Sequence, residues 1–348
     1  MFAEKLLSWY QEYGRVLPWR GIDNPYHIWL SEIILQQTRI EQGRDYYNHF
    51  VAEYPTIADL ADATEERVLK SWQGLGYYSR ARNLHAAAQH VANELGGHFP
   101  NTYEGILALK GVGKYTAAAI ASFAYRLPYP VIDGNVYRLV SRLYGISTPV
   151  GTNSAYQEFE RLLSHLIDKD RPDLFNHAIM DFGSIYCKPV GCDCHNCIFR
   201  QECVACRDGR VSEFPVRLKK ARVRDRYFCY VDIRWDNNLL VQCRAAGDIW
   251  QGLYELPLYE ASSATKGKRQ EKAVAAFLEA AFGVDASGII VGPAMKHKLT
   301  HQTVNAQFYR LDLSSAPIRL PENVCVVNQN DLRTLPVSRL IDRYLSMV

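Results

Sequence analysis

Four cysteines packed into one short segment constrain this chain more than any other feature. The segment reads Cys187-x6-Cys194-x2-Cys197-x5-Cys203, which places four thiols within 17 residues. Cysteines at this density, with a proline and a glycine between them, do not form an ordinary core and indicate a metal site held by four thiolates. Zinc ribbons pair two short Cys-x2-4-Cys knuckles, so gaps of six, two and five residues favour a 4Fe-4S cluster, with Zn²⁺ as the alternative.

The other cysteines agree with metal binding. Six of the nine lie between residues 187 and 206, and we interpret Cys192 and Cys206, which fall outside the four-ligand pattern, as bystanders, although either could replace a ligand. The chain has no apolar run near the ~20 residues of a membrane span and starts with acidic residues and no cleavage site. We therefore expect a soluble cytoplasmic protein without disulfides.

The hydrophobic pattern changes once along the chain. Up to about residue 207, apolar residues recur at three-to-four spacing, which predicts an all-α domain over residues 1–207. After a basic linker at 208–225, strand-like and helical segments mix, which predicts an α+β domain over residues 226–348. A length of 348 residues agrees with two or three domains.

The linker region is strongly basic. Six basic residues and one acidic residue lie between Arg217 and Arg226, while the net charge of the whole chain is only +3. Such a strip could contact phosphates, and an exposed linker without a partner explains it equally well.

Two glycines mark a turn between helical segments. Gly111 and Gly113 lack side chains, so a phosphate could approach the main chain there and meet the positive end of the following helix, as in a helix-hairpin-helix. A plain helix connection explains two glycines more simply. Eighteen residues after Tyr115, Asp133 stands where a helix begins; it suits an N-cap, and the helix dipole would also hold its carboxylate ionised near bound DNA.

Several ordered stretches carry a resemblance to a known family. They are Trp29–Ile33, Leu35–Thr38, Gly74–Leu84, Gly111–Thr116, Asp133–Val136 and the cysteine loop. With these stretches the chain resembles the helix-hairpin-helix DNA glycosylases that carry a 4Fe-4S cluster, and within them the adenine DNA glycosylases of the MutY type. The resemblance covers nearly the whole chain. It implies base excision repair of adenine opposite 8-oxoguanine or guanine in duplex DNA, by a monomer that associates with the nucleoid through DNA.

One position separates two branches of this family. The related bifunctional lyases have a lysine where Tyr115 stands, and that amine attacks the sugar to form a Schiff base. A phenol cannot do so, and the neighbouring Lys114 is turned about 100° away around a helix. The resemblance therefore predicts a monofunctional glycosylase.

The resemblance also assigns the catalytic residues. Glu32 lies in an apolar helical segment, where desolvation should raise its pKa and keep a proton for N7 of adenine. Asp133 would stabilise or capture the sugar cation, steadied by Asn135, while Tyr115 would hydrogen-bond near Glu32 and the sugar. From spacing alone, a partly exposed carboxylate and a packed aromatic would explain Glu32 and Tyr115.

The target base must leave the duplex, and similarity assigns residues to this step as well. Gln37 and Tyr77 would fill the gap, with Arg20 and Leu75 as helpers. The hairpin would bind the DNA backbone through the residues Gly111, Val112, Gly113 and Lys114. Gln37 could instead cap a helix, and Tyr77 could pack under Arg80.

The last part of the chain resembles the MutT-like, or Nudix-like, domain that reads 8-oxoguanine in this family. The match is clearest at Asp248–Pro257, and the hydrolase box of true MutT proteins is absent, so we expect binding without pyrophosphatase activity. The recognition loop, Phe-Ser-His in many relatives, is Leu299-Thr300-His301 here. Leu299 replaces an aromatic that could intercalate, whereas Thr300 and His301 keep their hydrogen-bonding groups. The alternative is a loop at a strand end that has no role in recognition.

Two other functions compete with this interpretation. One is a redox-sensing iron–sulfur module that binds DNA without cutting it; such a module needs neither Glu32 nor Asp133. The other is a glycosylase for mispaired thymine or another base on the same scaffold, which the MutT-like domain disfavours.

Overall fold

The computed structural model describes residues 2–218, 223–264 and 267–348. Contacts divide the chain into two compact units, Met1–Asp62 with Ala86–Lys219, and Ala63–His85 with Lys220–Val348. In the described ranges, no helix is long and apolar enough to cross a membrane. The domain limits at residues 207 and 226 remain predictions, and residues 219–222 of the basic linker lie outside the described part.

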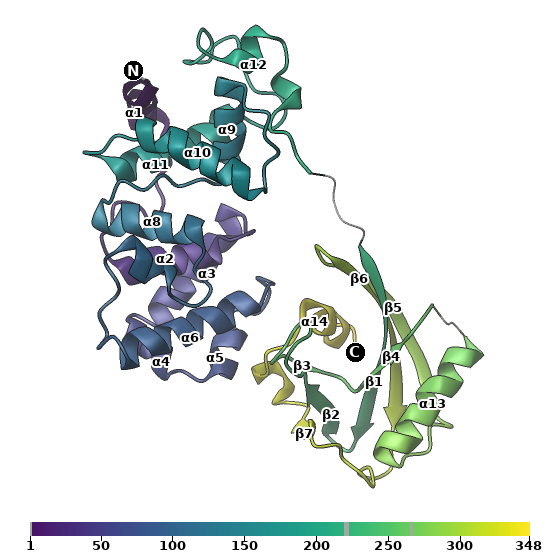
Figure 1. Cartoon of the computed structure of the whole chain (residues 1–348). Helices are drawn as coiled ribbons and strands as arrows, with labels where there is room; N and C mark the ends of the chain where they lie inside the picture. Colours follow the sequence, from purple (N-terminus) through teal and green to yellow (C-terminus); the bar gives the residue numbers. More distant parts are fainter. Residues whose placement is uncertain (1, 219–222, 265–266) are drawn as a thin grey trace. The chain divides into compact units, whose positions relative to one another are not determined.

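The first unit is helical, as the sequence predicts (Figure 1). Its elements are α1 (Phe2–Tyr13), α2 (Pro25–Ile34), α3 (Ile40–Glu53), α4 (Ile57–Asp62), α7 (Tyr103–Leu107), α8 (Lys114–Tyr125), α9 (Gly134–Tyr144), α10 (Asn153–Leu166), α11 (Pro172–Asp181), the π-helix η1 (Phe182–Tyr186), α12 (Val204–Arg207) and the 3-10 helix η2 (Val211–Glu213). The boundary between the two units falls inside α6 (Ser79–Asn93).

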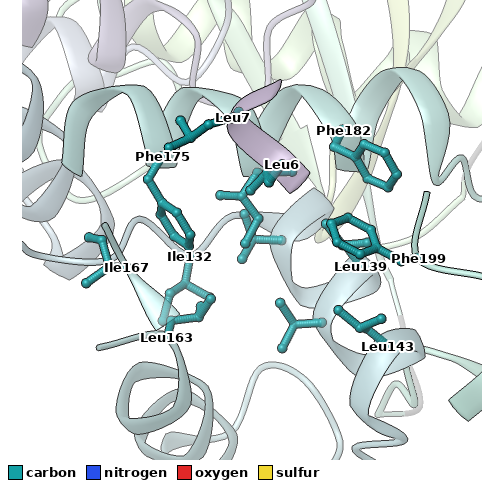
Figure 2. Close-up of a cluster of buried hydrophobic side chains, with 14 of the residues drawn as sticks. Leu6, Leu7, Ile132, Leu139, Leu143, Leu163, Ile167, Phe175, Phe182 and Phe199 are labelled. Carbon is teal, nitrogen blue, oxygen red and sulfur yellow. The ribbon is translucent and has the colours of Figure 1, made fainter. Parts of the chain in front are cut away.

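One hydrophobic cluster holds α1, α9, α10 and α11 together (Figure 2). Figure 2 shows Leu6 of α1 and Leu139 of α9 among these side chains, with Phe175 of α11 and Phe199 of the cysteine loop. The ring of Phe199 lies 5.2 Å from the ring of Phe182, centroid to centroid. The cysteine loop is therefore anchored in the core by an aromatic side chain.

The second unit contains α5 (Glu65–Ser71) and a seven-stranded sheet with its helices. The path of the sheet is β3-β2-β1-β6-β5, with β4 paired to β1 and β7 paired to β2. The strand pair β1 and β6 is parallel and the other pairs are antiparallel. The elements are β1 (Arg224–Trp235), β2 (Asn238–Cys243), β3 (Tyr254–Glu255), β4 (Leu258–Ala261), α13 (Lys268–Phe282), β5 (Ile290–Lys298), β6 (Gln302–Asp312), β7 (Val324–Asn328), η3 (Leu332–Thr334) and α14 (Arg339–Leu345).

Alternation along β1 explains why both faces of this sheet are covered. Phe228 and Tyr230 belong to the cluster that includes α14, whereas Cys229 and Val231 belong to the cluster that includes α13. Successive side chains of a strand point to opposite faces, so the two helices cover opposite sides of the sheet, as Figure 1 shows. The mixed α+β prediction is confirmed. The strand β1 begins at Arg224, inside the predicted linker.

Candidate active site

A cavity of about 390 Å³ in the first unit brings together the predicted catalytic residues. Its volume lies within the usual range for small-molecule sites. The lining comes from the segments before and after α2, from the helices α2, α3, α8, α9 and α11, and from η1: Arg15, Leu17, Trp19, Arg20, Glu32, Leu35, Thr38, Arg39, Ile40, Glu41, Tyr115, Asp133, Asn135, His177, Met180 and Ser184.

Glu32 is buried in α2, and only 7% of its surface is exposed. The helix starts at an Asn24 cap, whose side chain accepts from two backbone N–H groups, and Pro25 follows at the first turn. Burial raises the pKa of Glu32 to about 7, against the opposing effects of the Tyr115 hydroxyl and the Arg20 cation. The carboxyl can therefore hold a proton near neutral pH.

Tyr115 enters the cavity from the first turn of α8, one residue after Lys114. Burial, together with Glu32 and Asp133, raises the pKa of the Tyr115 phenol well above its usual value, so it stays neutral. The Lys114 ammonium points elsewhere and lies 4.3 Å from the centroid of the Tyr156 ring.

Asp133 caps α9. Its Oδ1 accepts from Asn135 N at 2.8 Å and from Val136 N at 2.7 Å, and its Oδ2 accepts from Asn135 Nδ2 at 2.6 Å. Burial raises the pKa of Asp133, whereas these donors and Arg138 lower it. The sequence-based expectation of a cap held ionised is thus modified, because the cost of desolvation outweighs the three N–H groups that favour the carboxylate.

Arg138 and Gly183 support the position of the Asp133 cap at the start of α9. Arg138 Nη2 donates to Asn135 Oδ1 at 2.8 Å and also to Gly183 O, and Arg138 Nε donates to Cys187 O at 2.8 Å. A Cβ on Gly183 would lie 2.8 Å from Asn135 O. Glycine is therefore needed where η1 approaches the start of α9, a site residue that spacing did not reveal.

A second buried carboxylate, Asp181, belongs to the same region. Arg20 Nη1 donates to Asp181 Oδ2 at 2.7 Å and Arg20 Nη2 to Oδ1 at 2.9 Å; Arg15 donates from its backbone N to Oδ2 at 2.9 Å. Burial opposes ionisation, yet the hydrogen bonds from Arg20 and Arg15 lower the pKa of Asp181 to about 2. Arg20, predicted as a DNA contact, is thus bound to Asp181.

His177 also lines the cavity, and the sequence analysis missed it. Its ring stacks on Phe123 with centroids 4.0 Å apart, and its Nδ1 has no hydrogen-bond partner among the described residues. Burial lowers the pKa of His177 to about 3, so the imidazole is neutral at pH 7. The available signal was the spacing of His177 and Asp181, polar residues four apart in an apolar helix.

The four predicted ligand cysteines line one small cavity together with Cys206. Arg142 stabilises the cysteine loop: its Nη1 donates to Lys188 O at 2.7 Å and contacts Cys187 Sγ at 3.4 Å. Within the described residues, no group of three or more His, Cys, Asp or Glu side chains is arranged to hold a metal ion. The donor set, soft thiols facing one apolar cavity with an N–H group on one sulfur, fits an iron–sulfur cluster chemically.

The hairpin turn lies between α7 and α8. Gly111 has a φ of 80°, Val112 is buried, and Gly113 is the N-cap of α8. A Cβ on Gly113 would meet nothing within 4 Å, so the backbone at the helix start is open to a ligand.

The two predicted wedge residues share an unusual backbone conformation. Gln37 has a φ of 57° and Tyr77 a φ of 48°, left-handed values that side chains rarely adopt. Gln37 is exposed and follows the C-cap of α2 at Leu35, while Tyr77 is 43% exposed. The Arg80 guanidinium lies 5.7 Å from the Tyr77 ring centroid, so the packing alternative is partly realised.

A second cavity, of about 400 Å³, lies within the second unit. It is formed by the turn before α6, the loop before β3 and the segment between β5 and β6, and it includes all three residues of the predicted recognition loop, Leu299, Thr300 and His301. The Tyr77 hydroxyl and the Thr300 hydroxyl form a hydrogen bond there. Leu75 also lines this cavity, although its own side chain is buried.

A charged network fixes the wall of the second cavity. Arg226 Nη1 donates to Asp248 Oδ1 at 2.6 Å, and Arg244 Nε donates to Ile249 O at 2.7 Å. The next residue, Trp250, has a φ of 59° and its ring lies 5.5 Å from that of His297. Trp250 and His297 are further lining residues that the sequence analysis did not single out.

Two family models match the chain. The model of HhH-GPD superfamily base excision DNA repair proteins matches residues 30–168, and the NUDIX domain model matches residues 229–347. The solved structure of a thermostable thymine-DNA glycosylase is 29% identical with a TM-score of 0.56, over 60% of this chain and 95% of that one. The fold and site thus define a helix-hairpin-helix DNA glycosylase core followed by a Nudix-like domain.

Curated relatives narrow this class. An adenine DNA glycosylase of Buchnera aphidicola subsp. Baizongia pistaciae is 33% identical, and the alignment covers 74% of this chain and 74% of the relative. The human adenine DNA glycosylase is 41% identical over 59% of this chain and 39% of its own length. The chain belongs to the adenine DNA glycosylase family.

Proposed function

We propose that this protein hydrolyses the N-glycosidic bond of adenine in duplex DNA, and that adenine opposite 8-oxoguanine or guanine is its substrate. Family membership supports adenine removal in base excision repair. The observation that carries the mechanism is one cavity lined by two unlike carboxyls. Glu32 has a pKa raised to about 7, and Asp133 accepts hydrogen bonds from three N–H groups.

The two carboxyls divide the reaction between them. Glu32 gives its proton to N7 of adenine while the bond from the sugar to N9 breaks and its electron pair leaves with the base. The Asp133 carboxylate stabilises the resulting sugar cation, or captures it covalently, at a position fixed by Asn135. Water then adds to the sugar carbon, displacing the Asp133 carboxylate where it has bonded to that carbon, and Glu32 takes the proton released from the water.

The absence of an amine nucleophile at position 115 makes the enzyme monofunctional. Tyr115 offers a neutral phenol at the cavity, and the Lys114 ammonium is occupied by the Tyr156 ring. No Schiff base forms with the sugar, so the strand is left intact at an abasic site. A strong borohydride-trapped adduct with any lysine would contradict this proposal.

The extruded base and the DNA backbone need further contacts. Gln37 and Tyr77 fill the gap that the extruded base leaves in the duplex. Both residues have a left-handed backbone conformation, and such strained conformations are often found at functional positions. The turn from Gly111 to Lys114 binds the phosphates through its open backbone N–H groups.

Cys187, Cys194, Cys197 and Cys203, which line one cavity, would hold a 4Fe-4S cluster. The cluster would supply a structural crosslink of the loop rather than a reaction step. Arg138 connects the backbone of Cys187 to Asn135, so the loop supports the position of Asp133.

The cavity of the second unit reads the base opposite adenine. Thr300 and His301 supply polar groups for a purine edge, and Leu299 gives an apolar surface in place of an aromatic. The hydrogen bond between the hydroxyls of Tyr77 and Thr300 joins the proposed wedge residue Tyr77 to this recognition loop.

The test is single-turnover release of adenine from duplexes with A opposite 8-oxoguanine, G, T or C, followed by separate alkali treatment. Release opposite 8-oxoguanine and G, with breaks only after alkali, is the expected result. Release of thymine from a mispair instead would favour the thymine glycosylase alternative. Tight binding without release of any base would favour a non-catalytic DNA-binding module.

A further inference from the structure

The environment of Asp181 is unlike that of Glu32, although both carboxyls are buried in the first unit. None of the Asp181 surface is exposed. Both Nη atoms of Arg20 donate to its two oxygens, at 2.7 and 2.9 Å, and Arg15 adds Nε at 2.8 Å and its backbone N at 2.9 Å. Asp181 is thus fully saturated by two cations, and neither oxygen is available to a substrate.

Arg20 interacts with both carboxyls. It donates to Asp181, it lines the same cavity as Glu32, and its charge lowers the pKa of Glu32. Arg20 Nη1 also donates to Tyr10 Oη at 3.3 Å and to Arg15 O at 3.2 Å. The buried Glu32 carboxyl is an acceptor on the same cavity wall for a guanidinium released from Asp181.

We propose that Asp181 is a positioning residue that holds the Arg20 guanidinium away from the Glu32 carboxyl, and so keeps the proton of Glu32 available for the leaving base. This inference rests on the proposed role of Glu32 as the acid. An ion pair between Arg20 and Glu32 would fix Glu32 as a carboxylate, which cannot protonate adenine.

The other charged and titratable groups around Glu32 do not take over the proposed role of Asp181. Tyr115 from α8 stays neutral, and Asp133 at the start of α9 raises the pKa of Glu32. His177 of α11 is neutral at pH 7, since burial lowers its pKa to about 3. The charged residues that also line the cavity are Arg15, Arg39 and Glu41.

The decisive experiment compares pH profiles of single-turnover adenine excision in the full-length protein loaded with its cluster. In the Asp181→Asn variant, the descending limb assigned to Glu32 should move to lower pH by about one unit, because an adjacent cation lowers a carboxyl pKa by roughly 1–3 units. Excision at pH 8 should then fall about tenfold, while excision at pH 5.5 should stay within about threefold of the unmodified protein.

Two further variants separate positioning from a structural defect. Arg20→Gln should move the same limb to higher pH, and Arg20→Gln with Asp181→Asn should return it towards the original position. A purely structural role of Asp181 would lower excision equally at all pH values. An unmoved limb in Asp181→Asn would overturn the proposal, and if that variant does not fold, an unmoved limb in Arg20→Gln would do so.

A direct titration keeps this test independent of the catalytic assignment. The ¹³C NMR signal of the Glu32 carboxyl, assigned by its loss in Glu32→Gln, reports its pKa without any turnover. A normal excision rate in Glu32→Gln would refute Glu32 as the acid. The effect of Asp181 and Arg20 on the Glu32 pKa would still be read from the NMR titration, where no change would refute the positioning role.

Discussion

The cavity around Glu32 in the first unit and the cavity around Thr300 in the second unit are similar in volume, at about 390 and 400 Å³, and opposite in chemistry. The first contains buried Glu32 and half-buried Asp133, both with raised pKa values, and no ion pair at Glu32 in the described contacts. In the second, hydrogen bonds from Arg226 hold the pKa of Asp248 well below its usual value. Hydroxyl, imidazole and indole groups make up much of the rest of that wall.

Under the proposed function, this difference separates a site for proton transfer from a site for recognition. A catalytic acid needs a pKa near the working pH, which burial without a full counter-charge provides. A recognition wall needs groups that are held in fixed positions, which paired charges and hydrogen-bonded hydroxyls provide. The two cavities should therefore respond to substitution in different observables.

The largest effect is expected for Glu32→Gln. Loss of the proton donor should slow single-turnover excision by roughly 10²- to 10⁴-fold, because general acid catalysis contributes about that much. Binding to duplexes and the preference for the opposite base should stay nearly unchanged. Glu41→Gln, which removes an exposed carboxylate at the rim of the same cavity, is the matched control and should change the rate little. Equal excision rates for Glu32→Gln and Glu41→Gln would contradict the role of the first cavity as the site of proton transfer.

The same substitution should stabilise the protein at high pH. The folded state raises the pKa of Glu32 from 4.5 to about 7, so its stabilising contribution is present below pH 4.5 and is lost as pH rises through 7. At about 1.4 kcal/mol per unit, Glu32→Gln should gain up to about 3 kcal/mol of unfolding free energy relative to the unmodified protein between pH 4.5 and pH 8. Denaturant unfolding of both proteins at the two pH values measures this, and a pH-independent difference would contradict it.

Gly183→Ala should act on the first cavity without removing any polar group. The new Cβ would lie 2.8 Å from Asn135 O and 3.0 Å from Asn135 Cβ, so the Asp133 cap must shift. Overpacking of this kind costs about 1–3 kcal/mol, and a displaced Asp133 should slow excision on the order of tenfold. Gly288→Ala, where a Cβ meets nothing within 4 Å, is the control. Full activity in Gly183→Ala would show that the close approach is not needed.

The smallest effect is expected in the second cavity. Thr300→Ala removes a hydroxyl that bonds Tyr77, worth about 1 kcal/mol, or roughly fivefold in affinity. We expect this loss in binding to duplexes with 8-oxoguanine opposite adenine and less loss with guanine, measured in the Glu32→Gln background so that no base is released. Thr300→Ser should restore binding. A change in the intrinsic excision rate of the protein with Thr300→Ala alone, at saturating enzyme, would contradict the assignment of recognition rather than catalysis to the second cavity.

Local context marks Glu32 as an acid in an apolar helical segment and Asp133 as a helix cap, and both positions also fit purely structural roles. The family resemblance predicted their catalytic roles, and both residues line one cavity. The exposed strand β5 lacks the clean alternation in burial that marks a half-buried strand, so the sequence pattern does not locate it. The basic strip from Arg217 to Arg226 ends inside β1, where Arg226 pairs with Asp248 and Glu260 of the second unit.

What the sequence by itself determined is the class of the two regions, helical before about residue 207 and mixed α+β after it, and the identity of the chemical groups, among them a cysteine loop and the two carboxyls of the proposed reaction. Helical spacing, strand alternation and capping act over a few residues and can be read locally. Only the tertiary structure decided which groups share a cavity and what charge each carries. His177, Asp181 and Gly183 gain their roles from contacts with distant segments, and the pKa of Glu32 depends on its burial and on Arg20, neither of which the sequence order encodes.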